Sequence, residues 1–446
     1  MVEGQKETTS HARAWTIRAA ALVVGAILVS AGTSSTGGAV KSSARASHAP
    51  AQLTSIHSVA PVAPVAPAAT PSGFAYGFDL STEGPYNEWP SSDQTATQTM
   101  RTFAGSFVDI PIMGWGVNVP EPAPGVYDFS NIAARIALVQ STGGVPIITL
   151  SAAPDWMKGG VPYVTNWNNL NVAPLPQHYA DYATLCAAVA AAFPQVKYFV
   201  VWKEMQGFWD TTTNQYDAAG YTTMYNDTYN AIKAVRPDAL VGGPYVSMHS
   251  KSTASAKSTM PRGAWGVLSQ ADANVITYWL ANKVGADFLA VDGRSYTNDV
   301  GLITDPVTST AKYAAVDAWL QTQTTLPIAW MESHILPDPT QWTDQQQAAV
   351  RVAALVEMQS SGAAAGMQWQ PQQQTGWDEG LWTTTLLLGG GLPTYLGTVL
   401  PQVLHVLSSP VTIVPGQPAG TLVATGALGT ISVNLNGGAT TVVVTP

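Results

Sequence analysis

Short apolar runs alternate with longer amphipathic stretches through most of the chain. Eight runs rich in β-branched and aromatic residues, each bounded by polar or turn-forming residues, predict strands that are covered on both faces. Between and after them lie eight segments whose apolar residues recur with helical spacing. The predicted strands are residues 74–80, 107–113, 145–150, 198–202, 240–245, 288–291, 328–331 and 366–369. The predicted helices are residues 93–103, 131–139, 178–193, 222–235, 273–283, 311–321, 344–359 and 395–407.

The alternation of strands and helices indicates an α/β fold. Eight βα units are the number that closes a (β/α)8 TIM barrel, which we expect over residues 73–409. The alternative is an open doubly wound sheet, which usually has a glycine-rich turn after its first strand. The sequence Asp79-Leu-Ser-Thr-Glu83 has no glycine at this place, which favours the barrel.

The last part of the chain has a different pattern. Residues 410–446 are too few to bury much surface by themselves. We therefore expect them to pack against the barrel as a small β-sandwich or cap. The β-rich pieces, separated by Gly, Pro and Asn turns, are residues 411–414, 421–425, 430–434 and 440–444.

The first 72 residues lack the pattern of a folded domain. Basic residues precede an apolar segment at 19–29 that is too short to span a bilayer. This predicts a signal peptide over residues 1–31 and a secreted, extracellular protein, with an uncleaved membrane anchor as the alternative. Residues 32–72 are rich in Ala, Pro and Ser and predict a disordered linker.

Composition and charge narrow the classes of function. Only 11% of residues are charged, and the net charge of −9 provides no basic surface for phosphates, so we expect no nucleic-acid partner. The 7 histidines show no metal-ligand spacing, and the single cysteine, Cys186, cannot build a zinc site, so we expect neither metal nor cofactor. The 15 Trp and 16 Tyr residues suit sugar-binding clefts, although most of them could equally be core.

Two glutamates follow predicted strands and could act together. Glu204 lies two residues past the strand at 198–202, and Glu332 directly follows the strand at 328–331. The carboxyl ends of the strands carry the chemistry of α/β barrels, so both side chains are expected at one mouth. Glycosidic bond cleavage needs such a pair: one carboxyl group protonates the leaving oxygen, and the other attacks the sugar or activates water. The pattern therefore predicts a glycoside hydrolase, although either glutamate could instead be a surface or ion-pairing residue.

Further motifs resemble a known family. Their order and spacing from residue 73 to about 444 resemble the clan A glycoside hydrolases, and most of all glycoside hydrolase family 39, the β-xylosidase and α-L-iduronidase group. The resemblance implies a retaining enzyme that cleaves a β-xyloside-like or related glycoside, oligosaccharide or polysaccharide by double displacement. It implies Glu204 as acid/base and Glu332 as nucleophile. The motifs are Gly125-Val-Tyr-Asp-Phe129, Ala153-Pro-Asp-Trp-Met157, Trp202-Lys-Glu204, Trp330-Met-Glu332 and Trp369.

Position 203 departs from that family. The family's acid/base normally follows an asparagine that binds the 2-hydroxyl group of the sugar, and here Lys203 stands in its place. An ammonium group close to Glu204 would hinder that residue as an acid. Lys203 could bind a hydroxyl or an acidic group of an unusual substrate. Alternatively, it could pair with Asp79 or Asp292 across the rim of the barrel.

Five other residues complete the predicted site. The turn after strand six lacks the family's histidine, and Tyr296 could donate a hydrogen bond to Glu332 and keep it ionised. His334, two residues after Glu332, could orient that carboxylate or stand in solvent. The candidate sugar platforms, with core packing as the alternative for each, are Trp115, Trp156 and Trp369.

Two other functions stay open. One is an endo-acting polysaccharide hydrolase of the same clan, which would differ in loop lengths that the sequence does not reveal. The other is a barrel that binds carbohydrate without cutting it, for which Lys203 is the main argument.

Overall fold

The computed structural model describes residues 73–80, 90–114, 119–253, 258–374 and 379–446. The predicted signal peptide (1–31), the predicted linker (32–72) and Trp115 lie outside these residues and stay predictions. Within the described ranges, no helix is both long enough and apolar enough to cross a lipid bilayer.

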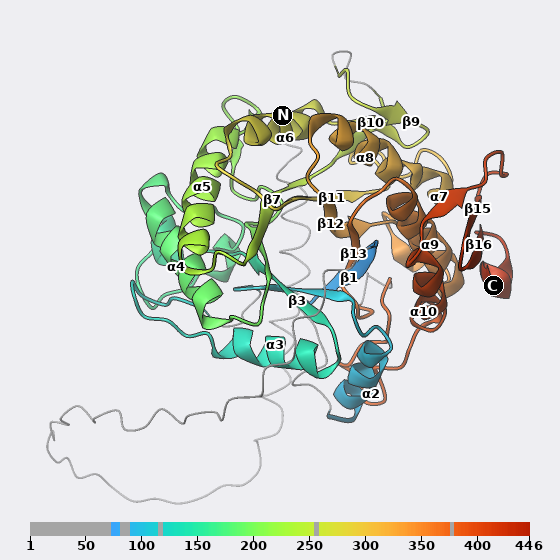
Figure 1. Cartoon of the computed structure of the whole chain (residues 1–446), viewed down its shortest axis with the longest axis horizontal. Helices are drawn as coiled ribbons and strands as arrows, with labels where there is room; N and C mark the ends of the chain where they lie inside the picture. Colours follow the sequence, from blue (N-terminus) through green and yellow to red (C-terminus); the bar gives the residue numbers. More distant parts are fainter. Residues whose placement is uncertain (1–72, 81–89, 115–118, 254–257, 375–378) are drawn as a thin grey trace, which may run out of the picture. The chain divides into compact units, whose positions relative to one another are not determined.

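Eight parallel strands close into a barrel (Figure 1). They are β1 (Ala75–Asp79), β2 (Phe107–Pro111), β3 (Val145–Leu150), β4 (Tyr198–Val201), β7 (Leu240–Ser247), β11 (Phe288–Arg294), β12 (Ile328–His334) and β13 (Ala365–Trp369). Their order around the ring is β1-β13-β12-β11-β7-β4-β3-β2, so strands consecutive in the barrel sequence are hydrogen-bonded neighbours. The predicted (β/α)8 barrel is confirmed, and each predicted strand coincides with one of these within a few residues.

Helices surround the strands on the outside of the barrel (Figure 1). They are α2 (Pro90–Arg101), α3 (Ser130–Ser141), α4 (Tyr179–Ala192), α5 (Ala218–Val235), α6 (Gln270–Asn282), the short α7 (Pro306–Ser309), α8 (Ala311–Gln323), α9 (Asp344–Ser360) and α10 (Tyr395–Leu407). Start signals in the sequence explain several of them. Thr343 caps α9 and forms a capping box with Gln346, and the Asp217 side chain caps α5.

Apolar side chains pack on both sides of the barrel wall. The larger cluster joins the strands to the surrounding helices. Because side chains alternate along a strand, every second residue instead points into the barrel, and this explains why the strands read as nearly continuous apolar runs. The inner cluster consists of Ala75, Phe107, Ile147, Val200, Tyr245, Phe288, Ala290, Ala329, Met331, Ala365 and Met367.

Two barrel strands carry one extra residue near their carboxyl ends. The pairing of β11 with β12 shifts by one residue at Met331, so that Asp292 pairs with Glu332. The pairing of β7 with β11 shifts in the same way at Tyr245. An extra residue of this kind changes the face of the strand on which the following side chains lie. These irregularities therefore set the direction of the polar side chains at the barrel mouth.

Several smaller sheets accompany the barrel. The last segment forms one antiparallel sheet against α9, where the Val411 N–H donates to Gln359 Oε1 and the Thr441 hydroxyl donates to the Gln345 carbonyl. The predicted β-rich region is thus present as a single sheet, and the domain boundary at residue 409 stays a prediction. This sheet consists of β14 (Val411–Ile413), β15 (Thr421–Gly426), β16 (Gly429–Asn434) and β17 (Val442–Thr445). The loops after β4 and β7 carry β5 (Trp209–Asp210), β6 (Gln215–Tyr216), β8 (Ser250–Lys251), β9 (Arg262–Gly263) and β10 (Gly266–Leu268).

Candidate active site

The chain leaves β4 through a bend of uncommon backbone conformation. Trp202, Glu204 and Met205 have φ angles of 67°, 52° and 55°. Residues other than glycine rarely adopt this left-handed region, so the surrounding packing must hold them there. The indole of Trp202 packs edge-on against Tyr182 of α4, which anchors the bend. Neighbours on a regular strand point to opposite faces, whereas this bend turns Lys203 and Glu204 toward the same mouth.

Glu332 lies buried among hydrogen-bond donors at the end of β12. Its side chain is only 2% exposed. The Tyr245 hydroxyl donates to its Oε2 atom at 3.0 Å, and the Nε2 atom of His334 lies 3.2 Å from its Oε1 atom. Contacts of this kind hold the carboxylate in a fixed orientation, as attack on a substrate requires.

His334 is held as a neutral imidazole beside this carboxylate. Burial, and then the charge of Arg294, hold the pKa of His334 well below its ordinary value. A neutral ring must therefore carry its hydrogen on Nε2 in order to donate to Glu332. The ring of Trp369, at the end of β13, lies 5.3 Å from the His334 ring. Of the two alternatives for His334, the structure thus favours orientation of the carboxylate over a place in solvent.

The two glutamates and one aspartate converge at the mouth. One carboxyl oxygen from each of Glu204, Asp292 and Glu332 lies within 4.8 Å of the other two. Glu332 and Asp292 are buried, and Glu204 is half-buried. These carboxyls are close enough to share a cation, but the ammonium group of Lys203 already lies 3.1 Å from Glu332 Oε2. We therefore read the cluster as a site of proton and nucleophilic chemistry.

Lys203 is committed to two buried carboxylates. Its Nζ atom lies 3.0 Å from Asp79 Oδ2 and 3.1 Å from Glu332 Oε2. Burial by itself would lower the pKa of Lys203, but the carboxylates of Asp79 and Glu332 outweigh it and hold that pKa well above its ordinary value. The expected pairing with Asp79 is thus observed, and the nucleophile candidate is a second partner that the sequence did not indicate.

A small recess of about 20 Å³ lies beside the acidic cluster. Lys203 and Gln206 form part of its wall, and the Gln206 side chain donates to Glu204 Oε2 at 2.6 Å. The recess therefore lies next to residues that contact each of the two glutamates. Its lining residues, from the ends of β2 and β3 and the loops after β3 and β4, are Pro111, Met113, Gly114, Ser151, Ala152, Leu170, Asn171, Lys203 and Gln206.

Two predicted residues have contacts that do not involve the glutamates. The Tyr296 ring is buried, and the guanidinium of Arg294 lies 5.9 Å from its centre. The Trp156 indole is 8% exposed and donates to the Glu121 carbonyl at 2.9 Å. The predicted roles of both residues stay predictions. A different tyrosine, Tyr245, donates a hydrogen bond to Glu332.

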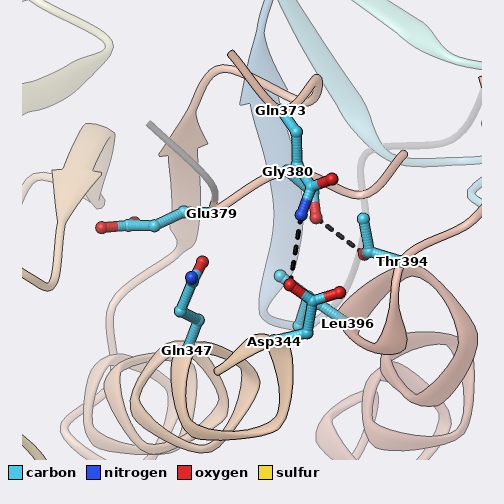
Figure 2. Close-up of a pocket in the computed structure, with 7 residues that line it drawn as sticks. All are labelled: Asp344, Gln347, Gln373, Glu379, Gly380, Thr394 and Leu396. Atoms are coloured by element: carbon cyan, nitrogen blue, oxygen red, sulfur yellow. Dashed lines mark hydrogen bonds between the residues drawn. The ribbon is translucent and has the colours of Figure 1, made fainter. Parts of the chain in front are cut away.

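A second, smaller pocket of about 10 Å³ lies at the start of α9 and α10 (Figure 2). Gln373 donates to Asp344, and the Thr394 hydroxyl donates to the Gly380 carbonyl. The carboxylate of Glu379 points away from Asp344 in Figure 2 and accepts a hydrogen bond from Arg351 at 2.6 Å. Arg351 also donates to the Ser333 side chain and carbonyl, so this network braces β12 directly after Glu332.

Comparisons with known proteins bear on the fold. No protein-family model and no curated protein matches the sequence. A β-xylosidase from Caulobacter crescentus CB15 matches with a TM-score of 0.53 at 17% identity, over 82% of this chain and 75% of that one. The family 39 enzyme from Xanthomonas axonopodis pv. citri gives 0.55 at 16% identity, over 82% and 73%. A family 39 glycoside hydrolase from the gut symbiont Bacteroides cellulosilyticus WH2 gives 0.52 at 13% identity, over 81% and 70%.

The chain has the fold of these family 39 glycoside hydrolases. The resemblance predicted from the motifs is therefore confirmed for the fold. Glu204 follows β4, the fourth barrel strand, and Glu332 lies near the end of β12, the seventh. Structural similarity at such low sequence identity supports only the fold. The reaction therefore has to be argued from the site itself.

Sequence reasoning missed Tyr245 and the position of Asp292 beside both glutamates. A signal for each was present, because Tyr245 ends a predicted strand and Asp292 directly follows the next one. The strand-end criterion that singled out Glu204 and Glu332 would have selected them as well, had it been applied to every polar residue.

Proposed function

We propose that the protein is a retaining glycoside hydrolase in which Glu332 is the nucleophile and Glu204 the acid/base. The observation that carries the proposal is the separation of at most 4.8 Å between carboxyl oxygens of the two residues. Retaining enzymes hold their carboxyl groups about 5–5.5 Å apart, whereas inverting enzymes need about 6.5–9.5 Å to admit a water molecule. The short separation supports direct attack on the sugar.

The different surroundings of the two glutamates support their different roles. Glu332 is buried and accepts from Tyr245, so its carboxylate is held in place to attack the anomeric carbon. Glu204 is half-buried and would give its proton to the leaving oxygen as the glycosyl ester forms on Glu332. In the second step Glu204 takes a proton from water, which attacks the ester and releases Glu332.

The substrate class follows from the charge of the site. The ammonium group of Lys203 is already occupied by Asp79 and Glu332, and the recess is lined mainly by apolar and amide groups. We therefore infer a neutral glycoside, such as a β-xyloside or a related oligosaccharide or polysaccharide, rather than an acidic sugar. Action outside the cell is part of the proposal and depends on the signal peptide predicted at residues 1–31.

A panel of neutral and acidic aryl glycosides tests the proposal. We expect turnover of at least one neutral substrate, and a 2-fluoro glycoside of the same sugar should form a stable ester on Glu332. Peptide mass spectrometry of the inactivated protein locates that ester. Absence of turnover across the panel, or an ester on another residue, would contradict the proposed function.

A second function is favoured by one contact. The Lys203 ammonium, 3.1 Å from Glu332, partly neutralises the charge that a nucleophile needs. A barrel that binds sugar without cutting it would tolerate this pair. Calorimetric binding of a xylo-oligosaccharide without any product would support that function, whereas short or internal cleavage products would distinguish exo-acting from endo-acting hydrolysis.

Replacing Tyr245 by phenylalanine should reduce turnover without disturbing the fold. The change removes the hydroxyl that donates to Glu332, and a hydrogen bond to a charged group is worth about 1.5–3 kcal/mol. We expect kcat/KM to fall roughly 10- to 100-fold. Tyr225→Phe is a matched control, because that hydroxyl donates to the Gly285 carbonyl outside the site. Equal activities of the two variants would exclude the role given to Tyr245.

A further inference from the structure

Asp292 is a buried acid at the mouth that the mechanism above does not use. It lies in β11, the sixth barrel strand, at the pairing shift opposite Glu332. Its side chain is 2% exposed, and in the part of the chain that the structure describes no donor reaches its Oδ1 atom. One of its carboxyl oxygens lies within 4.8 Å of both Glu204 and Glu332.

The groups that face Asp292 provide little positive charge. Glu204 and Glu332 approach it from the ends of β4 and β12, and the Tyr245 hydroxyl from β7. Lys312 of α8 interacts electrostatically with Asp292, but burial lowers the pKa of Lys312 to about 7. Its ammonium group donates to the Arg294 carbonyl and the Ser250 hydroxyl. The Tyr313 hydroxyl of α8 is neutral.

The ammonium of Lys203 is directed elsewhere. It contacts Asp79 and Glu332, and among the residues that the structure describes no lysine or arginine side chain forms an ion pair with Asp292. Burial, followed by the charges of Glu204 and Glu332, raises the pKa of Asp292 well above its ordinary value. Two carboxylates are both acceptors, so the hydrogen bond between Asp292 and Glu204 requires a proton on one of them.

We propose that Asp292 is a positioning residue whose neutral carboxyl group donates a hydrogen bond to Glu204. The proposal rests on the proposed function and adds a third carboxyl group to it. Asp292 keeps its proton throughout the cycle. Glu204 gives its own proton to the leaving oxygen, the resulting carboxylate accepts from Asp292, and Glu204 then recovers a proton from water.

Two substitutions distinguish whether Asp292 acts as a neutral hydrogen-bond donor or as a carboxylate anion. Asp292→Asn keeps the size and a donor, whereas Asp292→Leu keeps the approximate size and removes it. We expect kcat/KM to fall less than about tenfold in Asp292→Asn and about a hundredfold in Asp292→Leu, the effect of losing a hydrogen bond to a charged group. The loss in Asp292→Leu should be larger for aryl glycosides with poor leaving groups, and the pH profile should shift with it. Equal losses in both variants, independent of the leaving group, would overturn the proposal.

Thermal stability tests the same contact without any activity. The folded pKa of Asp292 is raised, so its contribution to stability is complete below about pH 4 and is lost as pH rises through the folded pKa. Asp292→Asn should therefore raise Tm relative to wild type more at pH 8 than at pH 5. In a Glu204→Gln background this gain should shrink, because the neighbouring charge is gone.

Asp109→Asn is the matched control for that measurement. Asp109 is another buried acid of the barrel, whose pKa burial and then the charge of Asp79 raise to about 8, but its hydrogen bond comes from Thr149. Its gain in Tm at pH 8 should be the same with or without Glu204→Gln. If the gain in Tm for Asp292→Asn is likewise the same with and without Glu204→Gln, the proposal is overturned. This test holds even if wild type hydrolyses no glycoside. A wild type inactive on every glycoside would instead count against the proposed function.

Discussion

Replacing Glu332 by glutamine is expected to abolish hydrolysis, with kcat lowered by about 10⁴-fold or more, as for other lost nucleophiles. The amide keeps the size of the side chain and its hydrogen bond from Tyr245, so the protein should stay folded. The measurement is kcat on the best aryl glycoside, together with circular dichroism. Azide added to Glu332→Ala should restore turnover in part, because a small anion can occupy the vacated space and attack the sugar.

The control for this prediction is another buried glutamate. Glu357 lies in α9, and burial raises its pKa to about 7, but it does not contact the acidic cluster within the described residues. Glu357→Gln should retain most of the activity. Glu332→Gln within tenfold of wild type would contradict the assignment of the nucleophile.

Replacing Lys203 by methionine is expected to destabilise the protein by about 3–5 kcal/mol, the usual cost of breaking a buried ion pair on one side. The change leaves Asp79 and Glu332 buried without their ammonium partner. The pKa of Lys203 is raised in the folded state, so its contribution is present at every pH below about 10. In the variant, protonation of Asp79, whose pKa burial raises, relieves that carboxylate, so the loss should be larger at pH 8 than at pH 5.

Urea unfolding measures this loss, and two variants control it. Lys233→Met removes a partly exposed ion pair with Asp287 and should cost no more than about 1 kcal/mol. Lys203→Met combined with Asp79→Asn should regain part of the stability, because one of the two orphaned charges is removed. Equal stability of Lys203→Met and Lys233→Met would show that the ammonium does not hold the carboxylates together.

The barrel could be predicted from the sequence because its strands are buried on both faces. Runs such as 198–202 and 328–331 have to be apolar, and their alternation with helical segments leaves few architectures. The meeting of the two glutamates at one mouth could also be predicted, because strand ends converge wherever a barrel closes. Both inferences depend on residue type and order along the chain, which the sequence states directly.

The partners of each carboxylate could not be predicted in the same way. The direction of Lys203 depends on the left-handed bend from Trp202 to Met205, and that of Tyr245 on an extra residue in β7. Such backbone conformations are imposed by tertiary packing, and the identities of non-glycine residues do not predict them. The hydrogen bond that Tyr245 makes to Glu332 was therefore not expected, and the bond expected from Tyr296 stays a prediction.

The extra residue at Met331 makes the pairing register at this point as consequential as residue identity. If the same residues paired regularly, Met331 would lie opposite Asp292, and every later side chain of β12 would turn to the other face of the sheet. Glu332 would then face the helices, although every functional group of the barrel would still be present. Deleting Met331 would instead leave Glu332 opposite Asp292, so the strand should tolerate a deletion at this position more readily than one at its neighbours.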